Sequence, residues 1–386
     1  MLFSFKKLNN NFANLSKFSL SFGNSLVYDS LSAMILNKIL SVAASIIKFF
    51  IIIFIFSINS NADENNIKQY SKDYGTLALM YHRFEENKYP STNINMEIFK
   101  KQIDIIKKKN HNFINLDEFS NKFENPKNKK KILITIDDAF YSFYDKAWPY
   151  LKKNKIPFIL FVSTEPVGKH GYMTWDQIKE IEKEDFVTIG NHSHSHKYLV
   201  DLDFNEFQDD IDKSIKIFKD KLGYNPVYFS YPFGEYSLEQ KKYISNNFKF
   251  AFGQHSGVID FNKDKYELPR FPINEKYGDL KRFEFLINLL PLQFKKIFPE
   301  DKFITDKKNP PNLLIEFFKE QKNINNINCF SDEGNKWKKS NIQFNNNKLL
   351  VKFTEKFNFR RGRINCSLND DDGWKWLGIQ FSVKID

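Results

Sequence analysis

The strongest constraint on the fold is a repeated change between short apolar runs and amphipathic stretches over residues 74–275. The apolar runs are rich in β-branched residues and nearly continuous, which is typical of strands covered on their outer face by helices. They lie at 75–82, 132–138, 158–164, 186–192, 227–234 and 248–253. Strands that alternate with helices form a parallel sheet or barrel. The sequence therefore predicts an α/β fold, with an α/β barrel as the leading choice.

The stretches between these runs have the periodicity of amphipathic helices. They lie at 95–109, 144–154, 174–184 and 205–223. The third opens with the T-x-x-Q pattern of a capping box, at Thr174 and Gln177. The fourth ends at Gly223, a residue typical of helix C-termini.

The pattern changes toward the C-terminus. The two prolines after Asn309 interrupt the chain, and from about residue 325 strand-like segments are separated by Asn, Asp and Gly. We predict a barrel domain followed by a small all-β domain. The predicted regions are an N-terminal extension with signal peptide or membrane anchor at 1–62, the barrel at 70–290, a linker at 291–324 and the β-domain at 325–386.

The N-terminal region predicts export. An apolar run at 49–58 is followed by small residues at 60–62 that offer a signal-peptide cleavage site. Two alternatives stay open: Met34 is the true start, or residues 39–58 remain as an inner-membrane anchor, which Lys48 in the middle of the span disfavours. We expect an exported protein, periplasmic or secreted, which meets the membrane only through such an anchor.

The net charge of +11 would ordinarily suggest an anionic partner. However, only six of the 58 basic residues are arginine, and the lysines are spread along the whole chain. The sequence shows no stripe of lysines interleaved with aromatic residues and no nucleic-acid-binding motif. We therefore do not expect nucleic-acid binding.

Two neighbouring aspartates, Asp137 and Asp138, stand at the end of an apolar run. Successive side chains of a regular strand point to opposite faces, but a turn at the carboxyl end of the strand lets both face the mouth of a barrel. Barrel enzymes keep their active sites at this mouth. The alternative is a helix N-cap aspartate with a solvated neighbour.

Three of the seven histidines, His192, His194 and His196, lie within five residues after another apolar run. His192 and His196 have i, i+4 spacing and can converge on one metal ion in a turn or a helix. Imidazole together with carboxylate is the ligand set of a catalytic zinc site with an open position. The cluster predicts a divalent metal, with zinc as the expected ion; a structural histidine is the alternative.

These segments resemble the motifs of the NodB-type polysaccharide deacetylases, carbohydrate esterase family 4. The first family motif, T-[FI]-D-D-G, appears as TIDDA at 135–139, and the second, H-[ST]-x-x-H, as HSHSH at 192–196. The third, R-x-x-x-P-[YF]-G, survives as YPFG at 231–234 without its arginine. The resemblance covers roughly residues 75–275, and the first two motifs together are highly specific.

The resemblance implies a distorted (β/α) barrel, the NodB homology domain, and a role for each matching residue. Asp138, His192 and His196 would hold the metal ion. Asp137 would be the general base that accepts a proton from water. The backbone N–H of Phe233 would donate to the oxyanion.

The general acid is assigned by a further resemblance. The segment LMYHRF at 79–84 resembles the YH segment that precedes the other motifs in the permuted branch of the family, which contains biofilm poly-N-acetylglucosamine deacetylases. His82 is therefore the candidate acid. His255, which follows a late apolar run, remains its competitor, and the family spacing leaves His194 outside the ligand set.

Two departures from the family pattern affect the predicted site. Ala139 replaces the usual glycine of the first motif, which would tighten the mouth. The arginine of the third motif, which contacts the base, is missing. Arg270, near the end of a late strand, is the candidate to orient Asp137 and keep it ionised; the alternative is a surface arginine.

The predicted β-domain contains the two cysteines of the chain, Cys329 and Cys366. Two cysteines cannot form a multi-cysteine zinc site, and an oxidising compartment favours their pairing in a disulfide. Trp337, Trp374 and Trp376 would suit stacking on sugar rings if they are exposed, but tryptophans in a small β-domain are more often part of its core.

We therefore predict a metal-dependent hydrolase that removes N-acetyl groups from an N-acetylglucosamine-containing polysaccharide or cell-envelope glycan. A non-catalytic glycan-binding protein on the same barrel is disfavoured, because every metal and base position is filled. An amidase acting on a non-sugar C–N bond stays open, because the two short motifs do not exclude it.

Overall fold

The computed structural model describes residues 74–124, 131–319 and 321–384. Met34 and residues 39–58, on which the predicted start, signal peptide or anchor depend, lie outside the described residues. Within the described ranges, no helix combines the length and the apolar character needed to span a membrane.

The first part of the described chain is organised around one sheet. Its strands run in the order β10-β1-β5-β6-β7-β8-β9, with β4 beside β5, and their pairings are parallel. The strands, with the short pair β2 and β3, are β1 (Thr76–Tyr81), β2 (Arg83–Phe84), β3 (Asn93–Ile94), β4 (Asn112–Phe113), β5 (Lys131–Ile136), β6 (Phe158–Val162), β7 (Val187–Asn191), β8 (Tyr228–Ser230), β9 (Phe250–Phe252) and β10 (Phe271–Pro272).

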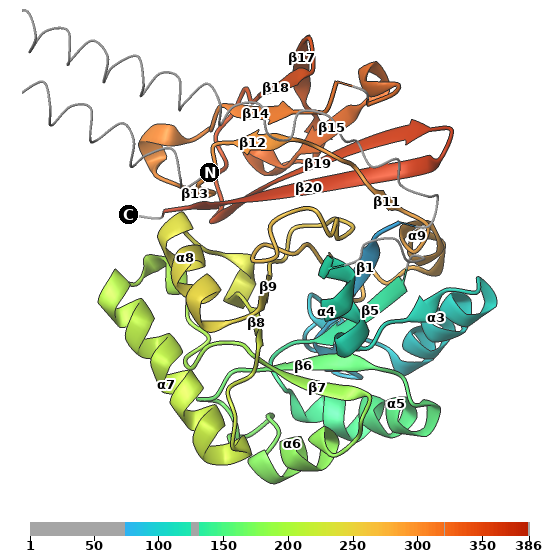
Figure 1. Ribbon diagram of the computed structural model, residues 1–386, viewed down its shortest axis with the longest axis vertical. Helices are drawn as coiled ribbons and strands as arrows, with labels where there is room; N and C mark the ends of the chain where they lie inside the picture. Colours follow the sequence, from blue (N-terminus) through green and yellow to red (C-terminus); the bar gives the residue numbers. More distant parts are fainter. Residues whose placement is uncertain (1–73, 125–130, 320, 385–386) are drawn as a thin grey trace, which may run out of the picture. The chain divides into compact units, whose positions relative to one another are not determined.

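Helices accompany the curled sheet, most of them around its outside (Figure 1). They are α3 (Met96–Lys108), α4 (Leu116–Glu124), α5 (Trp148–Asn154), α6 (Trp175–Glu182), α7 (Phe204–Leu222), α8 (Leu238–Asn247) and α9 (Leu280–Leu286). Leu116 and Phe119 of α4 instead pack in a core cluster with Ala78 of β1 and Leu133 of β5. The predicted capping box is present, because Thr174 accepts from the N–H of Gln177 and the Gln177 side chain bonds back. Gly223 ends α7 with a φ of 86°, as predicted.

Alternation along the strands separates an outer core from an inner one. On β1, Leu77 and Leu79 pack with the helices, whereas Ala78 belongs to the cluster inside the barrel. Leu133 of β5 belongs to the inner cluster as well. Because Asp137 continues the odd-numbered positions of β5, the period of two directs it to the inner side.

Residues 268–272 join the two ends of the sheet. Leu268 forms a parallel bridge with Phe252 of β9, and Phe271 pairs with Leu79 of β1. The sheet therefore curls into a distorted (β/α) barrel, as the sequence predicts.

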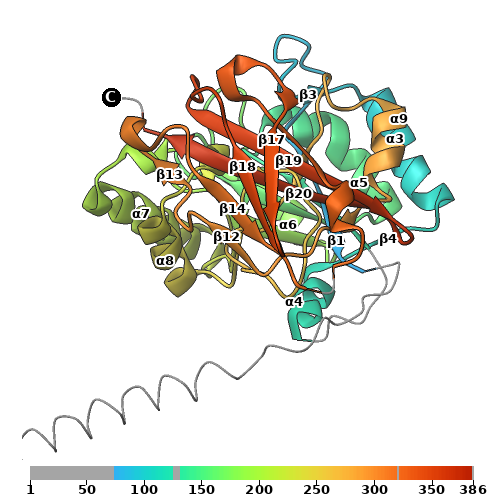
Figure 2. The same ribbon diagram turned by 90° about the horizontal axis from the view of Figure 1, so that it is seen from above.

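The C-terminal part forms two sheets, seen from above in Figure 2. One has the order β11-β20-β19-β15-β16 with β13 beside β20, and the other has the order β12-β14-β18-β17. Their strands are β11 (Leu290–Pro291), β12 (Lys296–Phe298), β13 (Phe303–Ile304), β14 (Leu313–Glu316), β15 (Asn328–Ser331), β16 (Lys338–Lys339), β17 (Asn341–Asn345), β18 (Lys348–Lys352), β19 (Arg361–Asp370) and β20 (Gly373–Val383). The two sheets share one apolar core.

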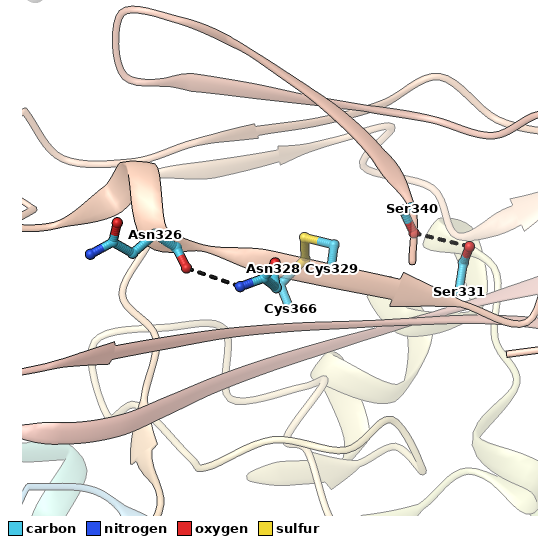
Figure 3. The surroundings of a disulfide bond; sticks show 6 residues. All are labelled: Asn326, Asn328, Cys329, Ser331, Ser340 and Cys366. Atoms are coloured by element: carbon cyan, nitrogen blue, oxygen red, sulfur yellow. Dashed lines mark hydrogen bonds between the residues drawn. A yellow bond between two sulfur atoms is a disulfide. The ribbon is translucent and has the colours of Figure 1, made fainter. Parts of the chain in front are cut away.

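A disulfide joins Cys329 of β15 to Cys366 of β19 (Figure 3). The two residues face each other directly in the antiparallel pairing of these strands, and both are buried in the β-domain core. The predicted pairing of the two cysteines is therefore confirmed.

The segment predicted as a linker, 291–324, contains β12, β13 and β14, which pair within the two C-terminal sheets. These strands have only two to four residues each, so they give little periodicity in the sequence. We propose that the β-domain begins near residue 290, ahead of the predicted boundary at 325.

Three helices, α4, α8 and α9, are missing from the sequence prediction. In α8, only Gln240 and Ile244 are buried, so the helix has little of the apolar periodicity on which the prediction depends. The α9 helix is only seven residues long. Short or weakly amphipathic helices owe their stability to tertiary contacts more than to local sequence.

Candidate active site

The loops that follow the strands bring the predicted site residues to one mouth of the barrel. All of them except Arg270 lie just beyond the carboxyl end of a parallel strand. They are His82 after β1, Asp137 and Asp138 after β5, His192 and His196 after β7, Phe233 after β8, and Arg270 just before β10. Parallel strands expose their carboxyl ends at one edge, which explains how residues distant in sequence meet here.

The backbone of these loops is unusually bent. The φ angle is positive at Asp138 (74°), Ala139 (53°), Ser193 (69°), His196 (54°) and Phe233 (60°). Residues with a Cβ avoid this region at a cost of roughly 1–3 kcal/mol, and such strain gathers at functional sites. At Ala139 this left-handed conformation explains why the family motif has glycine.

Two histidines converge on one aspartate. The Nε2 atom of His196 is 3.0 Å from Asp138 Oδ1, and that of His192 is 3.4 Å from the same oxygen. The three donor atoms all lie within 4.8 Å of one another. Among the described residues, the buried atoms Asp138 Oδ1 and His192 Nε2 have no hydrogen-bond partner.

This cluster fits a divalent metal ion. Buried polar atoms are rarely left without a partner, and two imidazole nitrogens with one carboxylate oxygen form a donor set suited to zinc. The Nδ1 atom of His192 is 2.7 Å from the carbonyl oxygen of Ser230. Because a carbonyl only accepts, Nδ1 carries the proton and Nε2 directs its lone pair toward Asp138.

The His194 side chain lies elsewhere. Its Nδ1 atom is 2.8 Å from the hydroxyl of Thr164, and burial lowers its pKa. The structure thus brings His192 and His196 together with Asp138 and directs the histidine between them to a different contact.

Asp137, the other aspartate of the pair, is held by Arg270, whose side chain is fully buried. Its two Nη atoms donate to Asp137 Oδ1 and Oδ2 at 2.7 and 2.8 Å. The guanidinium also donates to Gly253 O, Thr135 Oγ1 and Ser230 Oγ. Burial raises the pKa of Asp137, but the charges of Arg270, His192 and His82 and the hydrogen bonds from Arg270 together outweigh it, so the pKa is lowered. An arginine thus contacts this aspartate although the third motif lacks one.

Asp137 also faces two histidines. Its Oδ2 atom is 4.0 Å from His82 Nε2 and 4.0 Å from His192 Nε2. Burial lowers the pKa of His82, while Asp138 and Asp137 act in the opposite direction. His82 therefore lies beside Asp137, near the proposed metal ligands, and lines the cavity described below.

The competitor His255 lines the same cavity. Burial lowers its pKa to about 4, and Glu267 is the acidic residue that opposes this shift. The aspartates of the site influence His82 instead. The geometry therefore favours His82 over His255 as the histidine coupled to the aspartate pair.

The C-terminal sheet holds the turn at Phe233. Gln380 of β20 donates from Nε2 to the carbonyl oxygens of Phe233 and Gly234, at 3.2 and 3.1 Å. The Phe233 ring stacks on Tyr198 at 4.1 Å and lies 4.8 Å from the His196 ring. These contacts fix a backbone segment with positive φ next to the histidine cluster.

Glu235 ties the same turn to β19. It is 1% exposed, with Arg360 Nε 3.1 Å from Oε2 and Arg361 Nε 3.5 Å from Oε1. Burial raises its pKa to about 7, although the two arginines oppose the rise. The turn after β8 is thus bound to the β-domain by polar contacts on both sides.

A cavity of about 770 Å³ opens onto the site. Barrel residues that include His82, Asp138, His196, Phe233 and His255 form one part of its lining. The β-domain contributes another part, including Trp337, Arg361, Arg363, Asn365 and Gln380. The volume falls within the range of about 300–1,000 Å³ that is usual for ligand sites.

The fold and this constellation define a class: a barrel hydrolase with a site suited to a divalent metal ion beside an arginine-bound carboxylate. Residues 124–250 match the family described as polysaccharide deacetylase. This segment, which holds both aspartates and the histidine cluster, is therefore similar to the polysaccharide deacetylases.

Curated relatives from two staphylococci support the same family. Poly-beta-1,6-N-acetyl-D-glucosamine N-deacetylase of Staphylococcus epidermidis is 24% identical over 246 residues, which cover 56% of this chain and 85% of that protein. The protein of the same name from Staphylococcus aureus strain MSSA476 is 24% identical over 248 residues, with the same coverage of both chains.

Solved structures share the fold. IcaB from Ammonifex degensii superposes with a TM-score of 0.50 at 24% identity and covers 57% of this chain and 100% of its own. A polysaccharide deacetylase from Bacillus cereus gives a TM-score of 0.50 at 17% identity, over 56% of this chain and 69% of its own.

Sequence reasoning missed several residues that support the site. Asp210 of α7 accepts from the N–H groups of His194 and Ser195 and so holds the histidine loop. Nothing in the sequence distinguishes it from the other acidic residues of an amphipathic helix. No sequence pattern marks Gln380 or Glu235 either, because their hydrogen-bond partners lie more than a hundred residues away along the chain.

Proposed function

We propose that this protein removes N-acetyl groups from a β-1,6-linked N-acetylglucosamine polysaccharide. The observation that carries the proposal is the adjacency of two carboxylates with different partners: Asp138 meets two histidines, and Asp137 meets Arg270. The names of the staphylococcal relatives supply the substrate.

Asp138, His192 and His196 would hold the metal ion, with zinc as the proposed ion. When bound there, a divalent cation would polarise the acetamide carbonyl and lower the pKa of a water molecule. The orphaned Asp138 Oδ1 and His192 Nε2 atoms support this assignment, and the hydrogen bond from His192 to Ser230 keeps the imidazole in the required tautomer.

Asp137 would act as the general base. It takes one proton from water as the water oxygen attacks the acetamide carbon. Arg270 holds both carboxylate oxygens and keeps the group ionised, so the carboxylate is ready to accept a proton at neutral pH. The arginine also fixes the direction in which the carboxylate faces.

His82 would deliver a proton to the leaving nitrogen. When the C–N bond breaks, the sugar nitrogen needs a proton to leave as an amine, and acetate is released. The His82 ring lies 4.0 Å from Asp137 and lines the cavity, so it can accept a proton on the side of the aspartate and pass it to the nitrogen.

The turn at Phe233 would stabilise the oxyanion. A backbone N–H donor is effective only if it is held in place before the reaction. The two hydrogen bonds from Gln380 and the stacking of Tyr198 supply such fixation for this turn.

We place the reaction outside the cytoplasm. The Cys329–Cys366 disulfide supports this location, because structural disulfides persist in oxidising compartments. The predicted signal peptide or anchor at 1–62 would provide the export route.

Acetate release by the purified full-length protein tests the proposal. Zinc-loaded protein would be incubated with poly-β-1,6-N-acetylglucosamine, chitin oligomers, peptidoglycan and simple non-sugar acetamides. We expect release from the first substrate above all others. Binding without any release would indicate a glycan-binding protein, and preferential cleavage of the non-sugar acetamides would indicate an amidase; either result overturns the proposal.

A further inference from the structure

The cavity at the reaction centre has a polar wall that comes from the β-domain. Arg361, Arg363 and Asn365 line the cavity, and because they are two residues apart on β19 they share one face of the strand. The alternate residues Ile364 and Cys366 point the other way and are buried in the β-domain core. One face of β19 is therefore apolar and structural, and the other is polar and directed to the cavity.

The neighbouring strand β20 extends this polar face. Gln380 pairs with Arg363, and Gly378 pairs with Asn365. Gly378 lies so close to the barrel that a Cβ atom there would be 2.1 Å from the carbonyl oxygen of Ser256. The polar face of β19 and β20 therefore packs directly against the barrel loops.

An exposed tryptophan adds a flat apolar surface to this wall. Trp337 is 46% exposed and lines the same cavity. Pyranose rings have an apolar C–H face and a rim of hydroxyl groups, which match an indole face and nearby hydrogen-bond donors respectively. The guanidinium groups and the Asn365 side-chain amide provide those donors for hydroxyl and acetamide oxygens.

The charges of the lining are unbalanced. Apart from histidines, the charged residues that line the cavity are one acid, Asp138, and four bases, Lys276, Arg282, Arg361 and Arg363. The carboxylates that pair with the two β19 arginines, Glu235 and Asp332, are not among the lining residues. An N-acetylated sugar is neutral, whereas a deacetylated one carries an ammonium group that these bases would repel.

We infer that Trp337 and the polar face of β19 and β20 form a sugar subsite that binds a neighbouring N-acetylated unit and rejects a deacetylated one. This inference rests on the proposed function, since it assigns further units of the same polysaccharide to the wall. It names a role for a region that lies beyond the residues of the family match, 124–250.

The two exposed tryptophans of the β-domain provide a matched test. Trp337 and Trp374 are 46% and 44% exposed, but only Trp337 is among the residues that line the cavity. Acetate release is measured for Trp337→Ala and Trp374→Ala on acetylated dimers and pentamers. We expect kcat/KM of Trp337→Ala on the pentamer to fall about tenfold, more than on the dimer. Equal values for the two variants on the pentamer would overturn the subsite.

A second test addresses the charge. Acetate release is measured on two substrates, a fully acetylated pentamer and a pentamer that contains one internal glucosamine. The wild-type protein, Arg363→Gln and Arg363→Lys are each assayed on both. We expect Arg363→Gln to reduce the preference for the acetylated pentamer about fivefold, the scale of an exposed charge pair. Arg363→Lys should keep the preference, and an unchanged preference in Arg363→Gln would contradict the inference.

Failure of the two hypotheses can be distinguished. If wild-type protein releases no acetate from any pentamer, the proposed function fails. The subsite fails, and the proposed function stands, if the wild-type protein releases acetate but two results are absent. These are a specific loss of kcat/KM in Trp337→Ala and a reduced preference for the acetylated pentamer in Arg363→Gln. Thermal unfolding of each variant excludes loss of fold as the cause.

Discussion

The barrel and the β-domain reach the same cavity by different means. The barrel contributes side chains from loops at the carboxyl ends of parallel strands, and Asp137, Arg270 and His192 are completely buried there. The β-domain contributes one face of an antiparallel pair and the nearby Trp337, and the side chains of Trp337 and Arg363 are each about half exposed. Burial shifts pKa values and strengthens charge interactions, whereas accessible side chains can meet a long polymer.

This difference assigns chemistry to one region and recognition to the other. Variants at the barrel mouth should affect the rate of bond cleavage on every substrate. Variants in the β-domain should change how activity depends on substrate length, how strongly acetylated units are preferred over deacetylated ones, or how stable the protein is. The two regions nevertheless share contacts, since Gln380 and Arg360 hold the turn that follows β8.

The largest effect is expected at the proposed base and acid. Asp137→Asn keeps the size of the side chain but removes its basicity, so acetate release should fall by roughly 10² to 10⁴ while zinc stays bound. His82→Ala should lose a similar factor. The rate of acetate release by the double variant should fall by far less than the product of the two single losses, because the effects of residues on one proton path are not additive.

His255→Ala is the control for this assignment. It should retain activity close to that of the wild type, because its ring is coupled to Glu267 and not to the aspartate pair. Loss of turnover in His255→Ala with intact zinc, together with near-normal activity of His82→Ala, would transfer the role of the acid to His255.

Metal affinity should separate the histidines of the second motif. Alanine at Asp138, His192 or His196 removes one of three ligands and should cost about 3–4 kcal/mol, or roughly 10²- to 10³-fold in affinity. His194→Ala should retain zinc because its ring contacts Thr164. Bound zinc is measured after dialysis of the purified variants, and an equal loss at His194 would refute the ligand assignment.

The sequence was informative where chemistry needs fixed spacing along the chain. Asp137 with Asp138, and His192 with His196, are close in sequence, so short motifs reveal them. The strands β1 and β5 to β9 could also be predicted, because buried parallel strands give continuous apolar runs. Arg270 could be nominated only because arginine is rare in this chain.

The rest of the site depends on contacts between distant segments. Asp210, Glu235 and Gln380 are ordinary polar residues until the fold buries them against the histidine loop and the turn at Phe233. The short strands β12 and β13 are similarly stabilised by their pairing with β14 and β20. Tertiary interactions of this kind leave no periodic signal in a single sequence.

The disulfide should stabilise the β-domain. It spans 37 positions in sequence, and a loop of that length predicts a stabilisation of about 3–4 kcal/mol. Replacing Cys329 and Cys366 together by alanine should lower the free energy of unfolding by that amount in denaturant titrations. The wild-type protein under reducing conditions should show a similar loss, and two reactive thiols in the exported, unreduced protein would contradict the pairing.

The smallest effect is expected at the contact between the two regions, where Glu235 lies between Arg360 and Arg361. Burial raises the pKa of Glu235 from 4.5 to about 7 in the folded protein. Between these values the folded state binds more protons than the unfolded state, so this group makes stability fall as pH rises from about 4.5 to 7. Glu235→Gln stays neutral at every pH and should remove that contribution, about 1–3 kcal/mol across the window. Unfolding of both proteins is measured in zinc at several pH values, and the difference between them isolates Glu235 from the other titrating groups. Parallel stability curves would show that the arginines compensate its burial fully, so that the two regions are joined by an ion pair insensitive to pH.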